Sequence, residues 1–345
     1  SSAAQHSSSR TTAQRSDCLP EAIPGAECGT VTVPLIRSAP DQGRITVAYA
    51  LLRHRDRSRP AKGTVVANPG GPGDSAMAMA SAYAKLYAPL LADHDLLLVD
   101  PRGVNKSSPI NCGLPSHVTS RQALLRAVEQ CGRVLGANAR GYTTAETADD
   151  IEAIRAELRI PKLDLLGQSY GTYLMAVYAQ RHPGRVRSIV LSSAYPLDFD
   201  MWARPGVRAA RRTIYILCDR SGGKCDGRQL EADLGRLATR LQRAPIRYTD
   251  DNGNGRLLDA QMLASVFQHA ASEAAEHLGG FPDTVRAALE GDTEPLVATA
   301  RALDPYRLSA PGIPFNAAQT MAVACNDYPV LWNAEAPLAE RRRQF

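Results

Sequence analysis

The sequence has no apolar run long enough to cross a membrane and no basic stripe of the kind that binds nucleic acid. A membrane-spanning helix needs about 18 consecutive apolar residues, and the longest such run here surrounds Leu96–Val99. The net charge of +5 is mild for 345 residues. The run Arg341–Arg343 is too short for a polyanion-binding patch and is interpreted as a solvated helix end. We therefore expect neither a membrane span nor a nucleic-acid partner.

Cysteine spacing typical of a metal site, such as C-x-x-C, is absent as well, so no metal is expected. Cys325 is left over when the other six of the seven cysteines are grouped by proximity in sequence. Three local disulfides indicate an oxidising compartment, the alternative being reduced thiols in a cytosolic protein. The predicted disulfides are Cys18–Cys28, Cys112–Cys131 and Cys218–Cys225.

The first sixteen residues are polar and rich in serine, and no signal peptide is visible. We expect residues 1–16 to form a disordered tail. Such a start is typical of a mature terminus after removal of a signal peptide. Together with the predicted disulfides, it indicates a secreted protein.

Strands and helices alternate along the first half of the chain. A β-hairpin is predicted at 30–35 and 44–54, and short apolar strands at 64–67, 95–99, 163–166 and 186–191 alternate with helical patterns. This order is typical of a mostly parallel sheet with helices on both faces, and the 44% of hydrophobic residues supports a sizeable core.

After residue 200 the pattern becomes mostly helical, with only short loops such as DDNGNG between the helices. The expected organisation is a core at 17–200, a helical cap at 201–324 and a return toward the core at 325–345. The cap is expected to cover the site described next and to select the substrate.

The strongest chemical signal is the G-x-S-x-G pattern from Gly167 to Gly171, with Ser169 at its centre. An apolar strand enters this turn and a helical pattern leaves it, which is the arrangement of a nucleophile elbow. The turn is so tight that Gly167 and Gly171 must be small. Ser169 is therefore the predicted nucleophile, rather than a serine that merely caps a helix.

A second signal is the sequence NPGGPG at 68–73, directly after a predicted strand. Consecutive glycines leave backbone N–H groups free to point into a site. The N–H groups of Gly71 and Tyr170 are the predicted oxyanion hole, with Gly70 shaping the loop. The alternative is an ordinary Gly/Pro turn.

Asp100 and Arg102 follow the predicted strand at 95–99, in the sequence DPRG. We interpret them as a structural ion pair that braces the loop near the elbow, rather than as groups that act in the chemistry.

Together these motifs resemble the secreted prolyl and tripeptidyl aminopeptidase family of α/β-hydrolases, of the actinobacterial type. The GGPG loop is at 70–73, D-x-R-G at 100–103 and G-x-S-Y-G-T at 167–172. The segments CGTVTVPL at 28–35 and ACND at 324–327 are similar too. The resemblance implies secretion, an α/β-hydrolase fold with a helical cap, no cofactor, and hydrolysis from the peptide N-terminus. Asp74 and Asn105 stand where relatives often have glycine.

The sequence does not reveal the catalytic acid and the histidine base. In this fold they follow the nucleophile in the chain, yet only His182, His269 and His277 do so and none follows a predicted strand. We expect the acid, the base and the last strands of the sheet beyond Phe345, in the same polypeptide or in a separate C-terminal fragment, which also explains the unpaired Cys325. Asp198 or Asp200 is the alternative acid.

Three functions are compatible with these residues. The first is a serine exopeptidase that acts through an acyl-enzyme on Ser169. The second is an esterase, lactonase or amidase with a small acyl substrate, because the elbow and the oxyanion loop serve both kinds of acyl transfer. The third is a binding protein without catalytic activity.

Overall fold

The computed structural model describes residues 18–21, 23, 25–118, 120–198, 204–251, 253–272, 278–303, 314–330, 332–333 and 335–344. The chain divides into two compact units. The first comprises Ser1–Gly113, Cys131–Phe199 and Ser309–Asp327, and the second Leu114–Gln130, Asp200–Leu308 and Tyr328–Phe345. Residues 314–324 thus group with the sheet, whereas the sequence analysis assigned them to the cap. The predicted tail at 1–16 lies outside the described residues.

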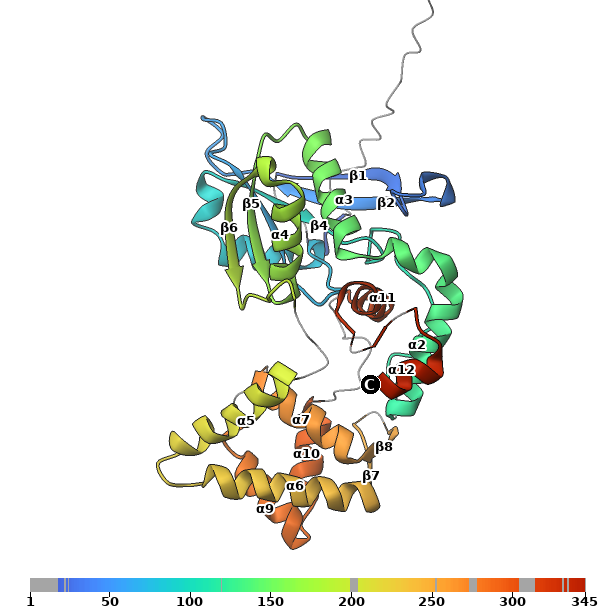
Figure 1. Ribbon diagram of the computed structural model, residues 1–345. Helices are drawn as coiled ribbons and strands as arrows, with labels where there is room; N and C mark the ends of the chain where they lie inside the picture. The colour runs from blue at the N-terminus through green and yellow to red at the C-terminus, as the bar shows by residue number, and fades with distance from the viewer. Residues whose placement is uncertain are drawn as a thin grey trace, which may run out of the picture. The chain divides into compact units, whose positions relative to one another are not determined.

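The described part of the first unit contains a six-stranded sheet with the order β1-β2-β4-β3-β5-β6 (Figure 1). β2 pairs antiparallel with β1 and β4, and the pairs β3–β4, β3–β5 and β5–β6 are parallel. The hairpin and the parallel strands predicted from the sequence are confirmed. The strands are β1 (Ala26–Pro34), β2 (Arg44–Leu52), β3 (Thr64–Asn68), β4 (Asp95–Val99), β5 (Leu163–Gln168) and β6 (Val186–Ser192).

Burial differs sharply between the centre and the end of this sheet. Every residue of β3 and β4 is buried, as expected for parallel strands covered on both faces. In β6, by contrast, Ile189 is 41% and Val190 59% exposed. Among the described strands only β5 pairs with β6, so this end of the sheet presents an apolar, unpaired edge.

Helices of the first unit pack against the sheet, and α4 lies beside β5 and β6 with α3 next to it (Figure 1). The helical structure between residues 77 and 92 is interrupted at 87–89, where Pro89 disfavours helical backbone at the residue before it. The helical segments here are η1 (Pro40–Gln42), η2 (Met77–Met79), α1 (Ala80–Leu86), η3 (Leu90–Ala92), η4 (Gly136–Gly141), α3 (Thr144–Glu157), α4 (Tyr170–Arg181), η5 (Pro183–Arg185) and α11 (Ala317–Asp327). Helix α2 (Arg121–Leu135) has residues in both units.

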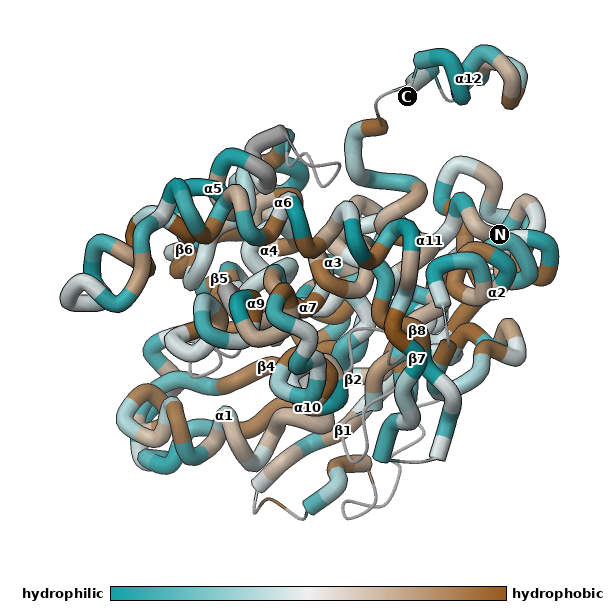
Figure 2. The backbone as a smooth tube through the Cα atoms, turned by 90° about the horizontal axis from the view of Figure 1, so that it is seen from below, coloured by the Kyte–Doolittle hydropathy of each residue, from teal (hydrophilic) through white to brown (hydrophobic). Residues whose placement is uncertain are grey.

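The second unit is mainly helical and has its own core. Figure 2 shows hydrophilic and hydrophobic colours alternating along α6, as in an amphipathic helix. Leu237, Val266 and Phe281 are among the side chains buried in this core. Its helices are α5 (Arg204–Asp219), α6 (Gly227–Arg243), α7 (Ala260–Ser272), α9 (Phe281–Glu290), α10 (Glu294–Leu303) and α12 (Leu338–Gln344).

One hairpin interrupts this helical region, which corrects the expectation of helices and loops alone. β7 (Ile246–Thr249) pairs antiparallel with β8 (Gly255–Leu258). Asp250 closes the turn by donating its N–H to the Asn254 carbonyl at 3.0 Å, and its carboxylate pairs with the buried Arg256 at 2.8 Å. The DDNGNG sequence is therefore a hairpin turn.

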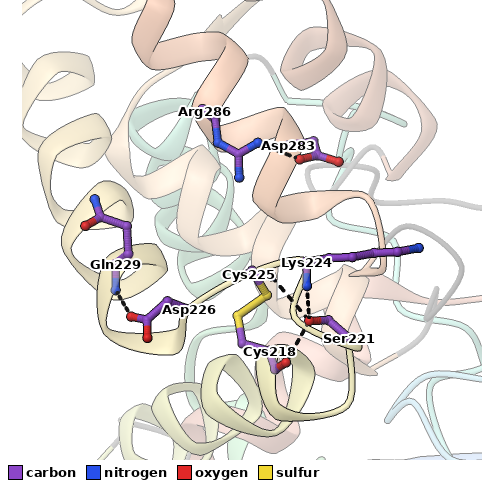
Figure 3. Close-up of a disulfide and its surroundings, with 8 residues drawn as sticks. All are labelled: Cys218, Ser221, Lys224, Cys225, Asp226, Gln229, Asp283 and Arg286. Atoms are coloured by element: carbon purple, nitrogen blue, oxygen red, sulfur yellow. Dashed lines mark hydrogen bonds and ion pairs between the residues drawn. A yellow bond between two sulfur atoms is a disulfide. The ribbon is translucent and has the colours of Figure 1, made fainter.

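All three predicted disulfides are present: Cys18–Cys28, Cys112–Cys131 and Cys218–Cys225. Figure 3 shows the last of them joining the end of α5 to the residue before the N-cap of α6. Within this loop the Ser221 hydroxyl donates to the Cys218 carbonyl at 2.7 Å and accepts from the Lys224 N–H at 3.0 Å. Asp226 then caps α6 by accepting from the Gln229 N–H at 2.8 Å. The disulfide thus holds a short α-helical hairpin closed.

Removing this bond should lower the stability of the second unit. Replacing both Cys218 and Cys225 by serine releases a closed loop of seven residues, which on the loop-entropy model costs about 2 kcal/mol. Urea unfolding monitored by circular dichroism measures the loss. Cys325→Ser is the matched control, because this exposed thiol is free, and it should change stability by less than about 0.5 kcal/mol. An equal effect of the two replacements would contradict the assigned role of the disulfide.

Candidate active site

Ser169 lies at the turn between β5 and α4 with a backbone conformation that few residues adopt. Its φ is 51° and its ψ is −129°, which is a strained region for a residue with a side chain. Its side chain makes no capping hydrogen bond to the helix, so it does not serve as an ordinary helix cap. Ser169 is exposed, and its N–H donates to the Ser192 carbonyl at 3.3 Å.

The glycines of the turn are required by close backbone contacts. A Cβ on Gly167 would overlap the Gly171 carbonyl, and one on Gly171 would overlap the carbonyl of Asn68 at the end of β3. Thr172 stabilises the turn through its side chain. Its hydroxyl donates to the Ser169 carbonyl at 2.6 Å and accepts from the Tyr195 N–H at 2.9 Å. The geometry is that of a nucleophile elbow.

The glycine-rich loop after β3 approaches this turn directly. A Cβ on Gly70 would lie 3.0 Å from the Ser169 Cβ and 3.1 Å from the Tyr170 nitrogen, and Gly70 has a φ of 115°. Gly71 also has a positive φ, of 101°, and is exposed. Asn68, which the sequence analysis missed, shapes the start of the glycine-rich loop by accepting the Gly70 N–H at 3.0 Å. The candidate oxyanion hole and the candidate nucleophile are therefore adjacent.

Helix α11 and the residues before it hold the far side of the glycine-rich loop. The Asn316 N–H donates to the Gly73 carbonyl at 2.9 Å, and the Thr320 hydroxyl donates to the Pro72 carbonyl. Asp74 and Phe315 form a β-bridge. No sequence pattern at 314–320 predicted these contacts, which join segments more than 200 residues apart.

Asp100 and Arg102 are both buried, but they do not form the predicted ion pair with each other. Asp100 accepts hydrogen bonds from the Ser75 hydroxyl at 2.7 Å, the Met77 N–H at 3.0 Å and the Asn105 side chain at 2.8 Å. Burial raises the pKa of its carboxyl, although these donors act in the opposite direction. Asp100 therefore organises the start of the segment after the glycine-rich loop, and Asn105 belongs to that network.

Arg102 pairs instead with Asp150 on α3. Its Nε and Nη2 each donate to the Asp150 carboxylate at 2.7 Å, and its Nη1 donates to the Leu35 and Gly141 carbonyls at 2.6 Å. The reason is geometric, because a bidentate carboxylate and two carbonyls satisfy the guanidinium fork better than a single neighbouring side chain. Both residues keep the scaffold roles expected of them, but with other partners.

The ACND segment at the end of α11 also has a structural role in this unit. The Asn326 amide donates to the Ala139 carbonyl at 2.8 Å, and the Asp327 carboxylate accepts the Thr144 N–H at 2.6 Å. Burial raises the pKa of the Asp327 carboxyl. These bonds attach α11 to the N-terminus of α3.

The described histidines do not form a base for Ser169. His182 ends α4, and its Nε2 lies 2.9 Å from the Asp149 carboxylate. His54 is bound by Asp95 through Nδ1 at 2.7 Å and by the Arg59 carbonyl through Nε2 at 2.9 Å; the Asp95 bond raises its pKa. Asp95 begins β4, and Ser169 follows the opposite end of the parallel strands.

The remaining candidates are only partly described. His269 is in α7 but its side chain lies outside the described residues, as do His277 and Asp200 entirely. Asp198 is exposed in the segment that follows β6. Among the described residues, no group of three or more His, Cys, Asp or Glu side chains is placed to hold a metal ion. Nor is any described helix both long enough and apolar enough to cross a membrane.

Comparisons with known proteins find similarity to α/β-hydrolases. Residues 63–220 match the family model described as the alpha/beta hydrolase fold. The chain is 34% identical over 195 residues to a protein named tripeptidyl aminopeptidase from Streptomyces coelicolor, a match that covers 51% of this chain and 36% of that one. It is 31% identical over 224 residues to the serine protease Hip1 of Mycobacterium bovis, covering 58% and 42%.

A crystal structure of an alpha/beta hydrolase from Novosphingobium aromaticivorans is 17% identical, with a TM-score of 0.35 over 69% of this chain and 70% of that one. The matches to the tripeptidyl aminopeptidase and to Hip1 cover 36% and 42% of those proteins, so this chain matches less than half the length of either relative. The family match confirms the α/β-hydrolase fold for residues 63–220, and the chain is similar over part of its length to proteins named as peptidases.

Proposed function

We propose that the protein is a secreted exopeptidase that releases short peptides or single residues from peptide N-termini through an acyl-enzyme on Ser169. The observation that carries the proposal is the Ser169 turn, with its strained backbone and its exposed side chain beside the glycine-rich loop. Two relatives named as a tripeptidyl aminopeptidase and a serine protease support a peptide substrate. The three disulfides support secretion.

In this mechanism the Ser169 oxygen attacks the scissile carbonyl as its proton passes to the base, and the N–H groups of Gly71 and Tyr170 stabilise the oxyanion. The C–N bond then breaks as the proton is delivered to the leaving amine, and water hydrolyses the acyl-enzyme. Two donors are needed because the tetrahedral intermediate carries a full negative charge, and the loss of one typically costs about 3 kcal/mol. The positive end of the α4 dipole adds to this stabilisation. Gly70, Gly167 and Gly171 keep the two backbone segments close enough for both donors to act.

We further propose that residues following Phe345, in the same polypeptide or as a separate fragment, supply the acid and the histidine. The support is the exposed apolar edge of β6, with Ile189 and Val190 open to solvent. A parallel strand paired there would end at the same edge of the sheet as Ser169, where such folds bind their substrates. Asp198 remains the alternative acid, since it also follows β6.

The test is a substrate panel for the full-length protein. Tripeptidyl and aminoacyl arylamides with a free amino terminus, the same compounds N-acetylated, and p-nitrophenyl esters are compared by kcat/KM. We expect the free-amine arylamides to be the best amide substrates and acetylation to abolish their cleavage. We also expect residues 1–345 alone to turn over none of the panel, because an unactivated serine hydroxyl is a weak nucleophile.

Other outcomes assign another function. Cleavage of the esters alone identifies an esterase acting on small acyl substrates. If no compound is cleaved and no serine-directed fluorophosphonate labels the full-length protein, the chain is a binding protein. Full activity of residues 1–345, verified by mass, overturns the proposed source of the base and directs attention to His269 and His277.

A further inference from the structure

Asp74 is a carboxylate that the proposed mechanism does not use, at the end of the glycine-rich loop. Its backbone is fixed on both sides, by the bond from the Asn316 N–H to the Gly73 carbonyl at 2.9 Å and by that from the Ser75 N–H to the Pro314 carbonyl at 3.1 Å. The bridge between Asp74 and Phe315 lies between these bonds. Asp74 therefore has a defined position a few residues from the candidate oxyanion hole.

The Asp74 carboxylate has no partner among the described residues. No hydrogen bond or ion pair of its side chain is found there, and burial alone raises its pKa. Asp100, which is also buried, shows the contrast, because three hydrogen-bond donors lie within 3.0 Å of its carboxylate. An acid that is partly removed from water and unpaired costs free energy, which a cation arriving with the substrate would recover.

The surroundings of Asp74 place it near Ser169. Burial raises the pKa of the Tyr83 phenol, and the charges of Tyr87 and Asp74 add to this effect. That phenol donates to the Gln168 side chain at 3.1 Å, so it is not a donor to Asp74. Gln168 is the residue directly before Ser169. Asp74 thus acts on a phenol that is hydrogen-bonded to the residue next to the candidate nucleophile.

We propose that Asp74 is a specificity residue that binds a positively charged group of the substrate. The inference rests on the proposed function, because it requires a substrate whose acyl carbon reaches Ser169. Asp74 follows Gly71, a proposed oxyanion donor, by three residues, and a Cβ on Gly71 would lie 2.9 Å from the Asp74 nitrogen. Substituents next to an acyl group bound at Gly71 would therefore lie near Asp74. The cation is an ammonium or guanidinium group, from either the peptide amino terminus or a basic side chain.

Two phosphonate probes test the proposal in the full-length protein. They share a reactive group and spacer, but one ends in a trimethylammonium group and the other in a neutral tert-butyl group. The measured quantity is the second-order rate constant for labelling of Ser169. We expect the wild-type protein to prefer the cationic probe by about tenfold, the effect of one partly buried ion pair, and this preference should fall as salt is added.

Asp74→Asn should abolish the preference while changing the rate for the neutral probe less than threefold. Asp74→Glu, which keeps the charge, should restore part of it. Asn105→Ala is the matched control, because it removes a hydrogen bond to the Asp100 carboxylate without removing a charge. This variant should keep the wild-type preference for the cationic probe. The neutral probe also reports whether each variant retains an assembled site.

The outcomes separate the two proposals. If neither probe labels Ser169 in the wild-type protein, the proposed function fails. If both probes label it and the preference is absent, or is the same in Asp74→Asn, the proposal for Asp74 alone is overturned. Tripeptidyl arylamides then identify the cation: Asp74→Asn should raise KM for all free-amine substrates if the amino terminus binds, and only for lysine-containing ones if a side chain does.

Discussion

Ser169→Ala should reduce kcat of the full-length protein on its best arylamide by on the order of 10⁶-fold, the loss measured when the nucleophile of another serine hydrolase is removed. The alanine cannot form the acyl-enzyme, so only the oxyanion hole and substrate binding remain, and these leave a small residual acceleration over water. KM should change little, because the lost interaction acts in the chemical step. Steady-state kinetics and labelling by a fluorophosphonate measure the two effects.

Ser188→Ala is the matched control for this prediction. Its hydroxyl donates to the Asp164 carboxylate at 2.6 Å, on β6 and β5 at the end of the sheet away from Ser169. The control should keep kcat within about twofold of wild type and should still be labelled. If Ser169→Ala retains more than about 1% of the wild-type kcat, another residue is the nucleophile and the mechanism proposed for this site is wrong.

The elbow could be predicted from the sequence because its constraint is local and steric. Gly167 and Gly171 each lie against backbone atoms that leave no room for a Cβ. The spacing of the two glycines around Ser169 is therefore enough to predict the turn. The disulfides could be predicted for the same reason, since each closes a short loop. Alternation of apolar strands with helices likewise indicated the parallel sheet.

The contacts between distant segments could not be predicted in this way. Arg102 pairs with Asp150 and not with Asp100, which is only two residues away in the sequence. No local sequence pattern around either aspartate predicts this pairing. Asn316 and Thr320 reach the glycine-rich loop from the other end of the chain. The β7–β8 hairpin was missed because its strands have four residues each and lie among amphipathic helices. Such pairings depend on three-dimensional packing rather than on local pattern.

The Arg102–Asp150 pair leads to a prediction about stability rather than activity. Both side chains are completely buried, and Arg37 also donates to the Asp150 carboxylate at 2.7 Å. Replacing one member of a buried pair typically costs about 3–5 kcal/mol. Arg102→Met would leave the Asp150 carboxylate with Arg37, whose side chain is 26% exposed, in place of its fully buried partner. In this case the Leu35 and Gly141 carbonyls also lose their donor.

Arg102→Met should therefore lower the free energy of unfolding by at least about 3 kcal/mol, measured by urea denaturation of the purified protein. Arg181→Met is the matched control, since Arg181 also pairs with an aspartate of α3, at 2.6 Å, but its side chain is 42% exposed. Exposed pairs contribute about 0–1 kcal/mol, and His182 still binds Asp149 in that variant. Adding Asp150→Leu to Arg102→Met should recover only part of the loss, because the buried Asp150 charge, then balanced by Arg37, is removed while the two carbonyls remain without their donor. Equal effects of Arg102→Met and Arg181→Met would show that burial does not set the strength of these pairs.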